Sequence, residues 1–421
     1  MKLFVMKSNK RLILFLKGSL KMTDYKKAME IIETLAIEPA VEKRPVEEAS
    51  GYILAEDIIA PLSMPRFDKS AMDGIALKAD DLLEHSVFHV LADITAGSVF
   101  EGEITPASCV KIMTGAPVPS GYDTVIRREY LEGYEEGRKI KVIREEKKGS
   151  NIAFQGEDFH EGNILFEKDG RITPFKAGTL AAVGLNNISV YRRPKTLFFA
   201  TGDEVYEPGE ELPLSGIYNA NASAVMAGLK EQGYPVAYGG IIADEAPALL
   251  EAFEKGEHEA DVIVFSGGVS EGDLDLIPEL IQKQGYTILY HKLNIKPGKP
   301  QLLAVKGKTW LMGLPGNPVS TTLSLYLFLL PLLKKISGHR NLFPRLRCGR
   351  LMQNGKQLKD RHHFIPVKVI QKDDLSFEMT PVPSNGSGDI HAAALADGYA
   401  RIPHEGEVYK SKCTEFFFIH E

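Results

Sequence analysis

Residues 261–275 read Asp-Val-Ile-Val-Phe-Ser-Gly-Gly-Val-Ser-Glu-Gly-Asp-Leu-Asp, a short apolar run followed by a polar, glycine-rich loop. The apolar run predicts a buried strand at 261–265, and helical spacing follows at 276–284. The same alternation continues on both sides of this stretch. It predicts strands at 196–200, 236–242, 286–292, 301–305 and 309–313, and helices at 222–232, 245–254 and 318–336. Strands and helices that alternate with short turns indicate a central, doubly wound and mostly parallel α/β domain.

The segments on either side of this domain have different patterns. Apolar residues at helical spacing predict helices at 25–35 and 175–184. Short apolar runs between Gly, Pro and Asp indicate a β-rich module, and the C-terminal residues have strand-like runs without helical periodicity. We expect an N-terminal extension or misassigned start at 1–21, a mixed α/β linker domain at 22–66 and 145–194, the β-rich module at 67–144, the α/β domain at 195–340 and a C-terminal β-barrel-like domain at 341–421.

The chain has 421 residues, with 50 Lys and Arg against 56 Asp and Glu and a formal net charge of −6. This balance argues against general nucleic-acid binding and against polybasic binding to membrane surfaces. The most apolar stretch, 323–333, is too short to span a bilayer and predicts a buried helix. We therefore expect no nucleic-acid partner and no membrane association.

The three cysteines, Cys109, Cys348 and Cys413, are widely separated and form no CxxC pair. This spacing predicts neither a disulfide framework nor a structural zinc site, and it favours packing roles for the thiols. A chain without disulfides fits a reducing compartment, so we expect a cytoplasmic protein.

Ligands of open α/β sheets bind outside the carboxyl ends of the strands. Polar loops are expected at three such ends, at 201–204, 266–275 and 313–320. In the third loop, Asn317 is a good N-cap and Pro318 fits the first helical position, so the unpaired amides of a helix start would face the sheet edge. Such amides bind anions. A tight turn without a ligand is the alternative.

Acidic residues are expected near the same edge, namely Asp203, Glu204, Asp244, Asp273 and Asp275. Each of them alone fits a helix cap or a solvated surface position. Together they favour a Mg²⁺ site, because Mg²⁺ prefers oxygen ligands and shares them with phosphates. Like charges at close range would otherwise repel each other.

Residues 292–300 read Lys-Leu-Asn-Ile-Lys-Pro-Gly-Lys-Pro, with lysines at 292, 296 and 299. A solvated face would rarely need this Pro-Gly rigidity. A fixed anion clamp would need it, because a rigid backbone loses less entropy on binding. The segment is therefore interpreted as an anion site.

Residues 268–272 match the GxSxG nucleophile elbow, with Ser270 after a strand and before a helix. His291 and one of the neighbouring acids would complete a triad. Two acids beside the nucleophile would disfavour a developing oxyanion, which argues against a serine hydrolase. Neither the GxGxxG nor the P-loop pattern occurs, so dinucleotide-dependent oxidoreductases and P-loop enzymes have no support.

Four further motifs resemble those of one family. They are Phe-Asp-Lys-Ser-Ala-Met-Asp-Gly at 67–74, Ile-Met-Thr-Gly-Ala-Pro-Val-Pro at 112–119, Asn-Ile at 151–152 and Gly-Glu-Asp at 156–158. Together with the loops described above, they follow the order found in the MoeA family, the molybdopterin molybdenumtransferases related to the gephyrin E domain. The resemblance covers about 23–421, which is nearly the whole chain.

This resemblance implies an enzyme of molybdenum cofactor biosynthesis whose α/β domain is of the molybdopterin-binding type, shared with the molybdopterin adenylyltransferases. It implies a four-part, elongated homodimer in which the partner chain's β-rich module completes the cleft. An adenylyltransferase is a candidate delivery partner. The implied reaction uses Mg²⁺ to hydrolyse the phosphoanhydride of adenylylated molybdopterin, releases AMP and inserts molybdate at the dithiolene.

The resemblance also implies site residues by their positions. Those expected in catalysis are Asp68, Thr114, Asp158, Glu204, Asp244 and Asp275, of which the last three would also be the metal ligands. Those expected to bind the pterin nucleotide or molybdate are Ser266, Gly267, Gly268, Lys292, Lys296, Lys299, Pro300, Pro315, Gly316, Asn317, Pro318 and Ser387.

The chain departs from the family pattern near the expected oxyanion site. Pro366 and Ala153 stand where arginines are usual, and Glu271 replaces a small or aliphatic residue. Losing cations and gaining an anion should weaken binding of a dianion. We hypothesise that the fold and nucleotide site are retained while oxyanion affinity or specificity has changed, with tungstate as one possibility. A non-catalytic pterin-binding scaffold and the adenylyltransferase step are the alternatives. Candidate replacements for the missing charge are Arg361, His363 and Lys368.

Overall fold

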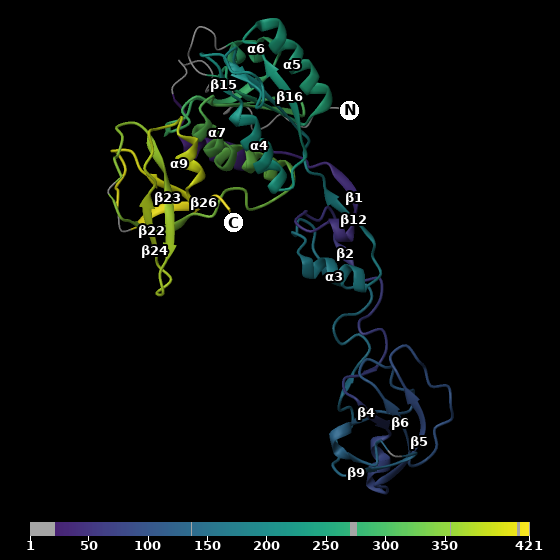
Figure 1. Cartoon of the computed structure of the whole chain (residues 1–421). Coiled ribbons are helices and arrows are strands. Elements are labelled where there is room, and N and C mark those ends of the chain that lie inside the picture. Colours follow the sequence, from purple (N-terminus) through teal and green to yellow (C-terminus); the bar gives the residue numbers. More distant parts are fainter. Residues whose placement is uncertain (1–21, 136, 270–275, 354, 411–412, 421) are drawn as a thin grey trace. The chain divides into compact units, whose positions relative to one another are not determined.

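A computed structural model describes residues 22–135, 137–269, 276–353, 355–410 and 413–420 (Figure 1). These residues form two compact units. The first unit contains the residues up to 40 together with 191–421, and the second contains 41–190. Each unit has its own sheets and its own hydrophobic clusters.

The first unit is built on a six-stranded sheet with the order β16-β13-β17-β21-β20-β18. Its strands are β13 Thr196–Thr201, β16 Val236–Ile242, β17 Val262–Ser266, β18 Thr287–His291, β20 Leu302–Lys306 and β21 Thr309–Leu314. The first four strands of the sheet order run parallel, whereas β20 is antiparallel to both of its neighbours. The predicted strands and their mostly parallel arrangement are confirmed.

Helices cover both faces of this sheet. They are α4 Ala220–Glu231, α5 Ala246–Glu259, α6 Ile277–Lys283, α7 Pro318–Ser324 and α8 Leu330–Ile336, with a π-helical turn at Leu325–Leu329. Alternate residues of β13 show how the faces divide. Phe198 packs in one cluster with α4, α7 and α8, whereas Leu197 and Phe199 pack in another cluster with α5 and α6. The doubly wound α/β fold is therefore confirmed.

The segment Pro318–Ile336 forms one long apolar helix inside this unit. By length and composition alone it could cross a membrane, and 78% of its most apolar 18-residue window is buried within the protein. The π-helical turn lies directly before α8, which carries Pro331 in its first turn, where a missing N–H disfavours a regular α-helical turn. The predicted buried helix is confirmed, and its apolar part extends beyond 323–333.

Among the described C-terminal residues, five strands close into a small barrel (Figure 1). They are β22 Arg347–Leu351, β23 His362–Gln371, β24 Phe377–Pro381, β25 Gly398–Ile402 and β26 Thr414–Phe418. The order β23-β24-β22-β26-β25 closes through the pairing of β25 with β23. The predicted barrel is confirmed. The structure adds the helix α9, Ile390–Ala394, which the sequence did not predict because five residues are too few to show helical periodicity.

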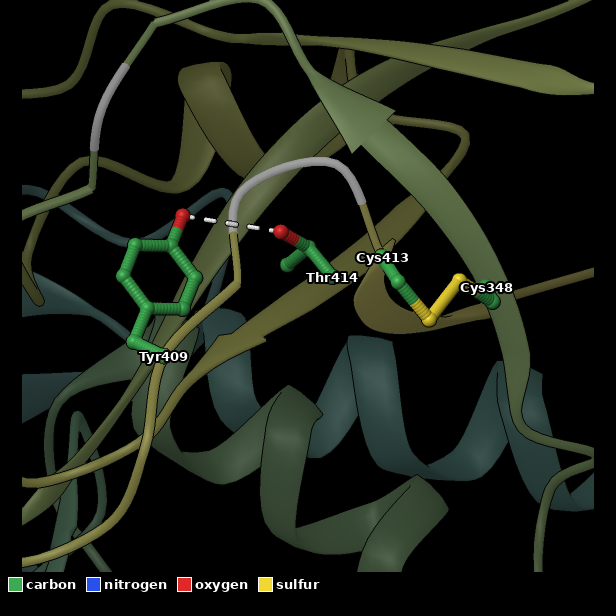
Figure 2. Close-up of a disulfide and its surroundings, with 4 residues drawn as sticks. All are labelled: Cys348, Tyr409, Cys413 and Thr414. Carbon is green, nitrogen blue, oxygen red and sulfur yellow. Dashed lines mark hydrogen bonds between the residues drawn. A yellow bond between two sulfur atoms is a disulfide. The ribbon is translucent and has the colours of Figure 1, made fainter.

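Cys348 in β22 and Cys413 next to β26 form a disulfide in the barrel (Figure 2). Their Cα atoms lie 5.1 Å apart, although 65 positions separate them in the chain. The antiparallel register of β22 with β26 pairs Cys348 with Glu415 and so brings the two cysteines together. The prediction that no disulfide forms is therefore wrong for these two residues, because only strand register makes them neighbours. Cys109 is a buried free thiol, as expected.

The N-terminal helix α2, Tyr25–Thr34, belongs to the first unit. Its buried face, which includes Tyr25 and Ile32, joins the same hydrophobic cluster as β13 and the barrel residue Phe364. Residues 22–40 therefore belong to the same unit as the α/β domain, whereas the sequence groups 22–66 with the linker domain. The finer division of the chain into domains remains a prediction.

The second unit contains a six-stranded sheet in the order β7-β4-β6-β5-β9-β8. Its strands are β4 Gly74–Leu77, β5 Val87–Ile94, β6 Ser108–Ile112, β7 Thr124–Arg127, β8 Leu131–Glu132 and β9 Lys139–Val142. Alternate residues of β4 enter different clusters, with Ile75 and Leu77 in one and Ala76 in the other. The predicted β-rich module is confirmed.

Short pairs of strands and one helix make up the rest of this unit. The pairs are β1 Val41–Pro45 with β12 Asn187–Tyr191, β2 Ile58–Ile59 with β11 Ile164–Phe166, and β3 Lys69–Ser70 with β10 Ile152–Ala153. The helix is α3 Pro174–Ala182, as predicted, and 3₁₀ turns lie at Val46–Glu48, Ala79–Leu83 and Arg128–Tyr130. A separate cluster that includes Leu54, Leu180 and Val190 forms its core.

A polar network joins α2 to the barrel. Arg401 in β25 donates to Nδ1 of His362 at 3.1 Å and to both carboxylate oxygens of Glu407. The ring of Tyr25 packs against that of His362, whose side chain is 1% exposed. Burial, followed by the charge of Arg401, lowers the pKa of His362 to about 4. Hydrogen bonds from Arg401 lower the pKa of Glu407 to about 2.

We predict that acid destabilises the first unit through His362. The unfolded chain binds a proton there below the ordinary pKa of 6.5, whereas the folded protein does so only near 4. The contribution of His362 to the free energy of unfolding is therefore fully present above pH 6.5 and is lost as the pH falls towards 4. The loss amounts to up to about 3 kcal/mol. Urea unfolding followed through Trp310, the single tryptophan of the sequence, measures this loss.

His362→Gln should flatten the stability profile in that pH range because it removes the titrating ring. His85→Gln, on the exposed surface of the second unit, serves as the control and should leave the profile unchanged. An equally steep profile in His362→Gln would contradict the assignment.

Candidate active site

A cavity of about 420 Å³ lies at the carboxyl ends of β13 and β17 and the loop after β21. The parallel strands bring these loops to one edge of the sheet, and α4 adds its first turn. Of the residues predicted from the sequence, the lining includes Glu204, Asp244, Ser266, Gly267, Gly268, Pro300, Gly316, Asn317 and Pro318. The structure thus gathers residues from distant parts of the chain, and their roles remain predictions.

Glycines allow the ends of β13 and β17 to approach each other closely. Gly267 and Gly268 have φ values of +103° and +65°. A Cβ atom on Gly267 would lie 2.6 Å from Oγ1 and 2.8 Å from the carbonyl oxygen of Thr201. Glycine adopts this conformation without strain and leaves the space free. The loop predicted to bind a ligand therefore also has a definite packing role.

Asn221, in the first turn of α4, connects two of the loops. Its Nδ2 atom donates to Oγ of Ser266 and to the carbonyl oxygen of Gly316, each at 2.7 Å. Oγ of Ser266 in turn donates to the carbonyl oxygen of Pro315 at 3.3 Å. The sequence analysis missed Asn221, although two asparagines, 219 and 221, at the start of a predicted helix were a visible signal.

Asn219 also lines the cavity and acts as the N-cap of α4. Its Oδ1 atom accepts a hydrogen bond from the backbone N of Ala222 at 3.0 Å. Its Nδ2 atom donates to the hydroxyl of Tyr238 in β16 at 2.8 Å. The capping residue therefore ties the start of α4 to the edge strand of the sheet.

The loop before α7 has the predicted form, but the Asn317 side chain does not make the hydrogen bond expected of an N-cap. Asn317 occupies the N-cap position and Pro318 the first turn, yet no capping hydrogen bond from the Asn317 side chain occurs among the described residues. The hydroxyl of Thr321 supports the loop instead, by donating to the carbonyl oxygens of Pro315 and Asn317. Gly316, Asn317 and Pro318 line the cavity, whereas Pro315 is buried outside the lining.

The barrel reaches the same edge through Ser387. The carbonyl oxygen of Ser387 accepts a hydrogen bond from the backbone N of Val319 at 3.2 Å, so its loop lies against the first turn of α7. Ser387 is not part of the cavity lining. The structure therefore places this predicted residue next to the cavity rather than in its wall.

Main-chain and side-chain hydrogen bonds fold the lysine-rich segment back on itself. The backbone N of Lys292 donates to the carbonyl oxygen of Gln301 at 2.9 Å. The buried side chain of Gln301 donates to the carbonyl oxygen of Gly298, also at 2.9 Å. The cavity lining includes Pro300 but none of Lys292, Lys296 and Lys299.

Two predicted metal ligands, Glu204 and Asp244, line the cavity together. Glu204 precedes a short strand pair, β14 Val205–Tyr206 with β15 Ile217–Tyr218, that forms part of the same wall. Carboxylate oxygens suit Mg²⁺, which takes its other ligands from phosphates and water, so this pair fits a magnesium ion shared with a nucleotide. Four residues discussed in the sequence analysis, Ser270, Glu271, Asp273 and Asp275, lie outside the described residues.

A second group of possible metal ligands comprises His362, His404 and Glu407, with donor atoms within 4.8 Å of one another. Arg401 already donates to His362 and Glu407, and so puts a guanidinium where a cation would sit. The Nδ1 atom of His404 accepts from the backbone N of Gly406 at 3.0 Å. A metal ion would have to displace a buried guanidinium, so we interpret this group as structural.

Asp68, Thr114 and Asp158 belong to the second unit and are exposed. Oδ1 of Asp68 accepts from the backbone N of Gln155 at 2.8 Å. The backbone N and the hydroxyl of Thr114 both donate to Oδ1 of Asp73, at 2.7 and 2.8 Å. These two hydrogen bonds lower the pKa of Asp73. Asp73 therefore orients Thr114, a role that the sequence analysis did not assign to it.

Pro366 lies within β23 of the barrel, where the family resemblance leads us to expect an arginine. Of the candidate replacements, Lys368 forms an ion pair with Asp397 at 3.2 Å. His363 lies in register with Lys296, because β19, Ile295–Lys296, pairs in parallel with β23. His363 is therefore the candidate that lies beside the lysine-rich segment.

Comparisons with known proteins agree with this architecture. Three family descriptions match in order: "MoeA N-terminal region (domain I and II)" at 23–184, "Probable molybdopterin binding domain" at 198–335 and "MoeA C-terminal region (domain IV)" at 349–411. The molybdopterin molybdenumtransferase of Bacillus subtilis is 36% identical over 378 residues, which are 88% of this chain and 87% of that protein. The molybdopterin molybdenumtransferase of Haemophilus influenzae is 35% identical over 311 residues, which are 74% and 76% of the two chains.

Solved structures give the same result. Two structures of the molybdopterin biosynthesis MoeA protein from Pyrococcus horikoshii match with TM-scores of 0.79 and 0.76. Their sequence identities are 29% and 27%, and the matches cover 95% and 94% of this chain and 99% and 100% of theirs. The match therefore extends over both units.

We predict that Gly267→Ala disturbs the cavity. The added Cβ atom would lie 2.6 Å from Oγ1 of Thr201 at a φ of +103°, so the strand ends would have to separate. The expected loss of unfolding free energy is about 1–3 kcal/mol, with weaker binding of AMP. Urea unfolding through Trp310 and calorimetric titration with AMP measure the two effects.

Gly209→Ala is the matched control for this substitution. Gly209 has a φ of +101° but no heavy atom within 4 Å of its would-be Cβ. It therefore reports the cost of the backbone conformation without the contact. If both variants bind AMP equally well, the close approach at Gly267 does not shape the site.

Proposed function

The chain belongs to the molybdopterin molybdenumtransferases, enzymes of molybdenum cofactor biosynthesis, and we propose that it acts on adenylylated molybdopterin in a Mg²⁺-dependent reaction. The cavity carries this proposal, because two carboxylates line it together with glycine-rich loops at the ends of parallel strands. Its volume of about 420 Å³ is within the range of small-molecule sites. Carboxylates alone would repel a phosphate, so the arrangement calls for a cation between them.

In the proposed reaction, water attacks phosphorus in the phosphoanhydride, the bridging P–O bond breaks, and AMP separates from molybdopterin. Glu204, Asp244 and Asp275 would hold Mg²⁺, which when bound supplies positive charge to the phosphate oxygens. The main-chain N–H groups of Gly268, Gly316 and Asn317 would orient the phosphates. Molybdate would then form two bonds to the dithiolene sulfurs, and one of its oxygens would leave as water with the two thiol protons. Ser387 and the lysines at 292, 296 and 299 would form this site.

The assembly that we propose is a homodimer. The exposed Asp68, Thr114 and Asp158 of the second unit would complete the site of a partner chain, and an adenylyltransferase would deliver the pterin nucleotide. The support is the pair of hydrogen bonds by which Asp73 fixes an exposed threonine, since a purely solvated hydroxyl needs no such orientation. The disulfide in the barrel is the observation that argues against a reducing compartment.

We also propose that the oxyanion site has diverged. Pro366 cannot supply the charge of an arginine, and His363 beside Lys296 is the neighbouring polar replacement. Ala153 in β10 lies opposite Lys69 in β3, so a lysine is close to the other missing arginine. A non-catalytic scaffold that only binds the pterin is the alternative, and AMP release separates the two functions.

We predict that the purified protein releases AMP from adenylylated molybdopterin in the presence of Mg²⁺ and molybdate, and that EDTA abolishes the release. Glu204→Gln should slow the reaction about 100-fold, because an amide cannot balance the charge of the metal. Glu211→Gln, an exposed change in the loop between β14 and β15, should have little effect. Chromatographic quantification of AMP measures the release by the unmodified protein, with and without EDTA, and by the two variants. Binding of the substrate without any release would contradict the proposal and favour the scaffold.

We predict that Pro366→Arg makes the protein bind molybdate more tightly, so that AMP release saturates at a lower molybdate concentration. The guanidinium would add a charge-assisted hydrogen bond to a dianion, which should lower the half-saturating molybdate concentration about 10-fold. Ile370→Arg, which adds the same charge at an exposed position of β23, serves as the control. Titrations with molybdate and with tungstate measure the effect. If Pro366→Arg responds to both anions as the unmodified protein does, position 366 does not contact the oxyanion.

A further inference from the structure

We propose that Asn221 is a positioning residue of the nucleotide site, where it fixes the end of β17 and the loop after β21 at the spacing that the substrate phosphate requires. This inference rests on the proposed function, because it assigns a task within the same cavity. Asn221 lines the cavity together with both of its partners, Ser266 and Gly316. One carboxamide therefore joins three elements of the cavity wall, namely α4, the end of β17 and the loop after β21.

The chemistry of its two partners requires an amide at this position. The carbonyl oxygen of Gly316 can only accept a hydrogen bond. Oγ of Ser266 donates its proton onward to the carbonyl oxygen of Pro315, so it also accepts from Asn221. The NH₂ group of asparagine supplies both hydrogen atoms from one nitrogen. An aspartate has the same shape, but when ionised it offers an oxygen to the carbonyl of Gly316, which can only accept, and it competes with the carbonyl of Pro315 for the hydroxyl proton of Ser266.

These hydrogen bonds fix two consecutive peptide groups. The carbonyl of Pro315 accepts from Ser266 and Thr321, and the carbonyl of Gly316 accepts from Asn221. In a trans peptide the C=O and the next N–H point in opposite directions, so the N–H groups of Gly316 and Asn317 are fixed as well. Both residues line the cavity. Oriented main-chain N–H groups bind anions, which gives Asn221 an indirect effect on the phosphate.

The oxygen atom of the Asn221 carboxamide indicates that this residue serves the ligand site rather than stability. Oδ1 of Asn221 is buried and accepts no hydrogen bond within the described part of the chain. The hydroxyl of Thr201, another lining residue, is also buried without a hydrogen-bond partner in the described part of the chain. A buried polar atom without a partner lowers stability. A residue selected for stability alone would avoid that cost, so the two donor hydrogens of Asn221 account for its presence.

The test compares Asn221→Asp and Asn221→Ala with the unmodified protein in AMP release from about pH 5 to about pH 8. At the upper pH, kcat/KM should fall about 10- to 100-fold in both variants. The activity of Asn221→Asp relative to the unmodified protein should recover as the pH falls. The carbonyl oxygen of Gly316 and the carboxylates of Glu204 and Asp244 in the same cavity should raise the pKa of an aspartate at this position, and a protonated carboxyl again donates one hydrogen bond. The relative activity of Asn221→Ala should stay constant.

Two controls separate positioning from other effects. Ser223→Asp adds the same charge at an exposed position of the same helical turn and should change kcat/KM little at any pH. Urea unfolding through Trp310 shows whether the variants fold. A merely structural role would lower stability in both variants without the pH-dependent recovery of activity in one of them.

Calorimetric titration with AMP distinguishes failure of this inference from failure of the proposed function. If the unmodified protein releases AMP and Asn221→Asp shows no recovery at acid pH, the positioning role is overturned. If the unmodified protein binds AMP but releases none, the proposed reaction fails. The inference then stands when Asn221→Asp binds AMP more weakly with the same recovery at acid pH, and it falls when binding is unchanged. Absence of AMP binding by the unmodified protein overturns both.

Discussion

One hydrophobic core holds together the elements that surround the cavity. The sheet face that carries Phe198 packs with α2, α4, α7 and α8, and the barrel residues Phe364 and Tyr399 enter the same cluster. Interiors of this kind are close-packed, so the barrel has one well-fitting position against the sheet. That position brings the loop of Ser387 to the first turn of α7. The surroundings of the cavity therefore depend on apolar packing that lies outside it.

Polar contacts then set the shape and the charge of the cavity. Gly267 leaves room for Thr201, and Asn221 holds the facing loops, so main-chain groups come to line the wall. The described lining contains the carboxylates of Glu204 and Asp244 but no lysine. The lysine-rich segment contributes only Pro300 to it. The carboxylates therefore line the cavity and the lysines do not. Under the proposed function, this arrangement suits a phosphate bound through a metal at the cavity and an oxyanion bound directly by the lysines.

The sequence predicted what periodicity and local chemistry encode. The strands, the long helices and the loops that line the cavity follow from alternating patterns and from glycine-rich segments at strand ends. Contacts set by tertiary structure could not be predicted. Asn221 finds its partners 45 and 95 positions away, the disulfide depends on the register of two barrel strands, and α2 packs on a helix and a barrel from the far end of the chain. The short α9 has no periodicity to detect.

Under the proposed function, a proline at position 366, where the family resemblance implies an arginine, changes what must hold the oxyanion. Burial, together with the charges of Lys296 and Arg361, lowers the pKa of His363 and so disfavours the charged form of its ring. A neutral imidazole can donate a hydrogen bond but cannot supply the charge and paired donors of a guanidinium. Under the proposed function, a larger share of the attraction for molybdate falls to the three lysines. Lysine presents a hydrated point charge without a fixed fork of donors, so such a site selects an anion by its charge more than by its geometry. Such a site keeps its attraction for a dianion while it loses the geometric selectivity that a guanidinium provides.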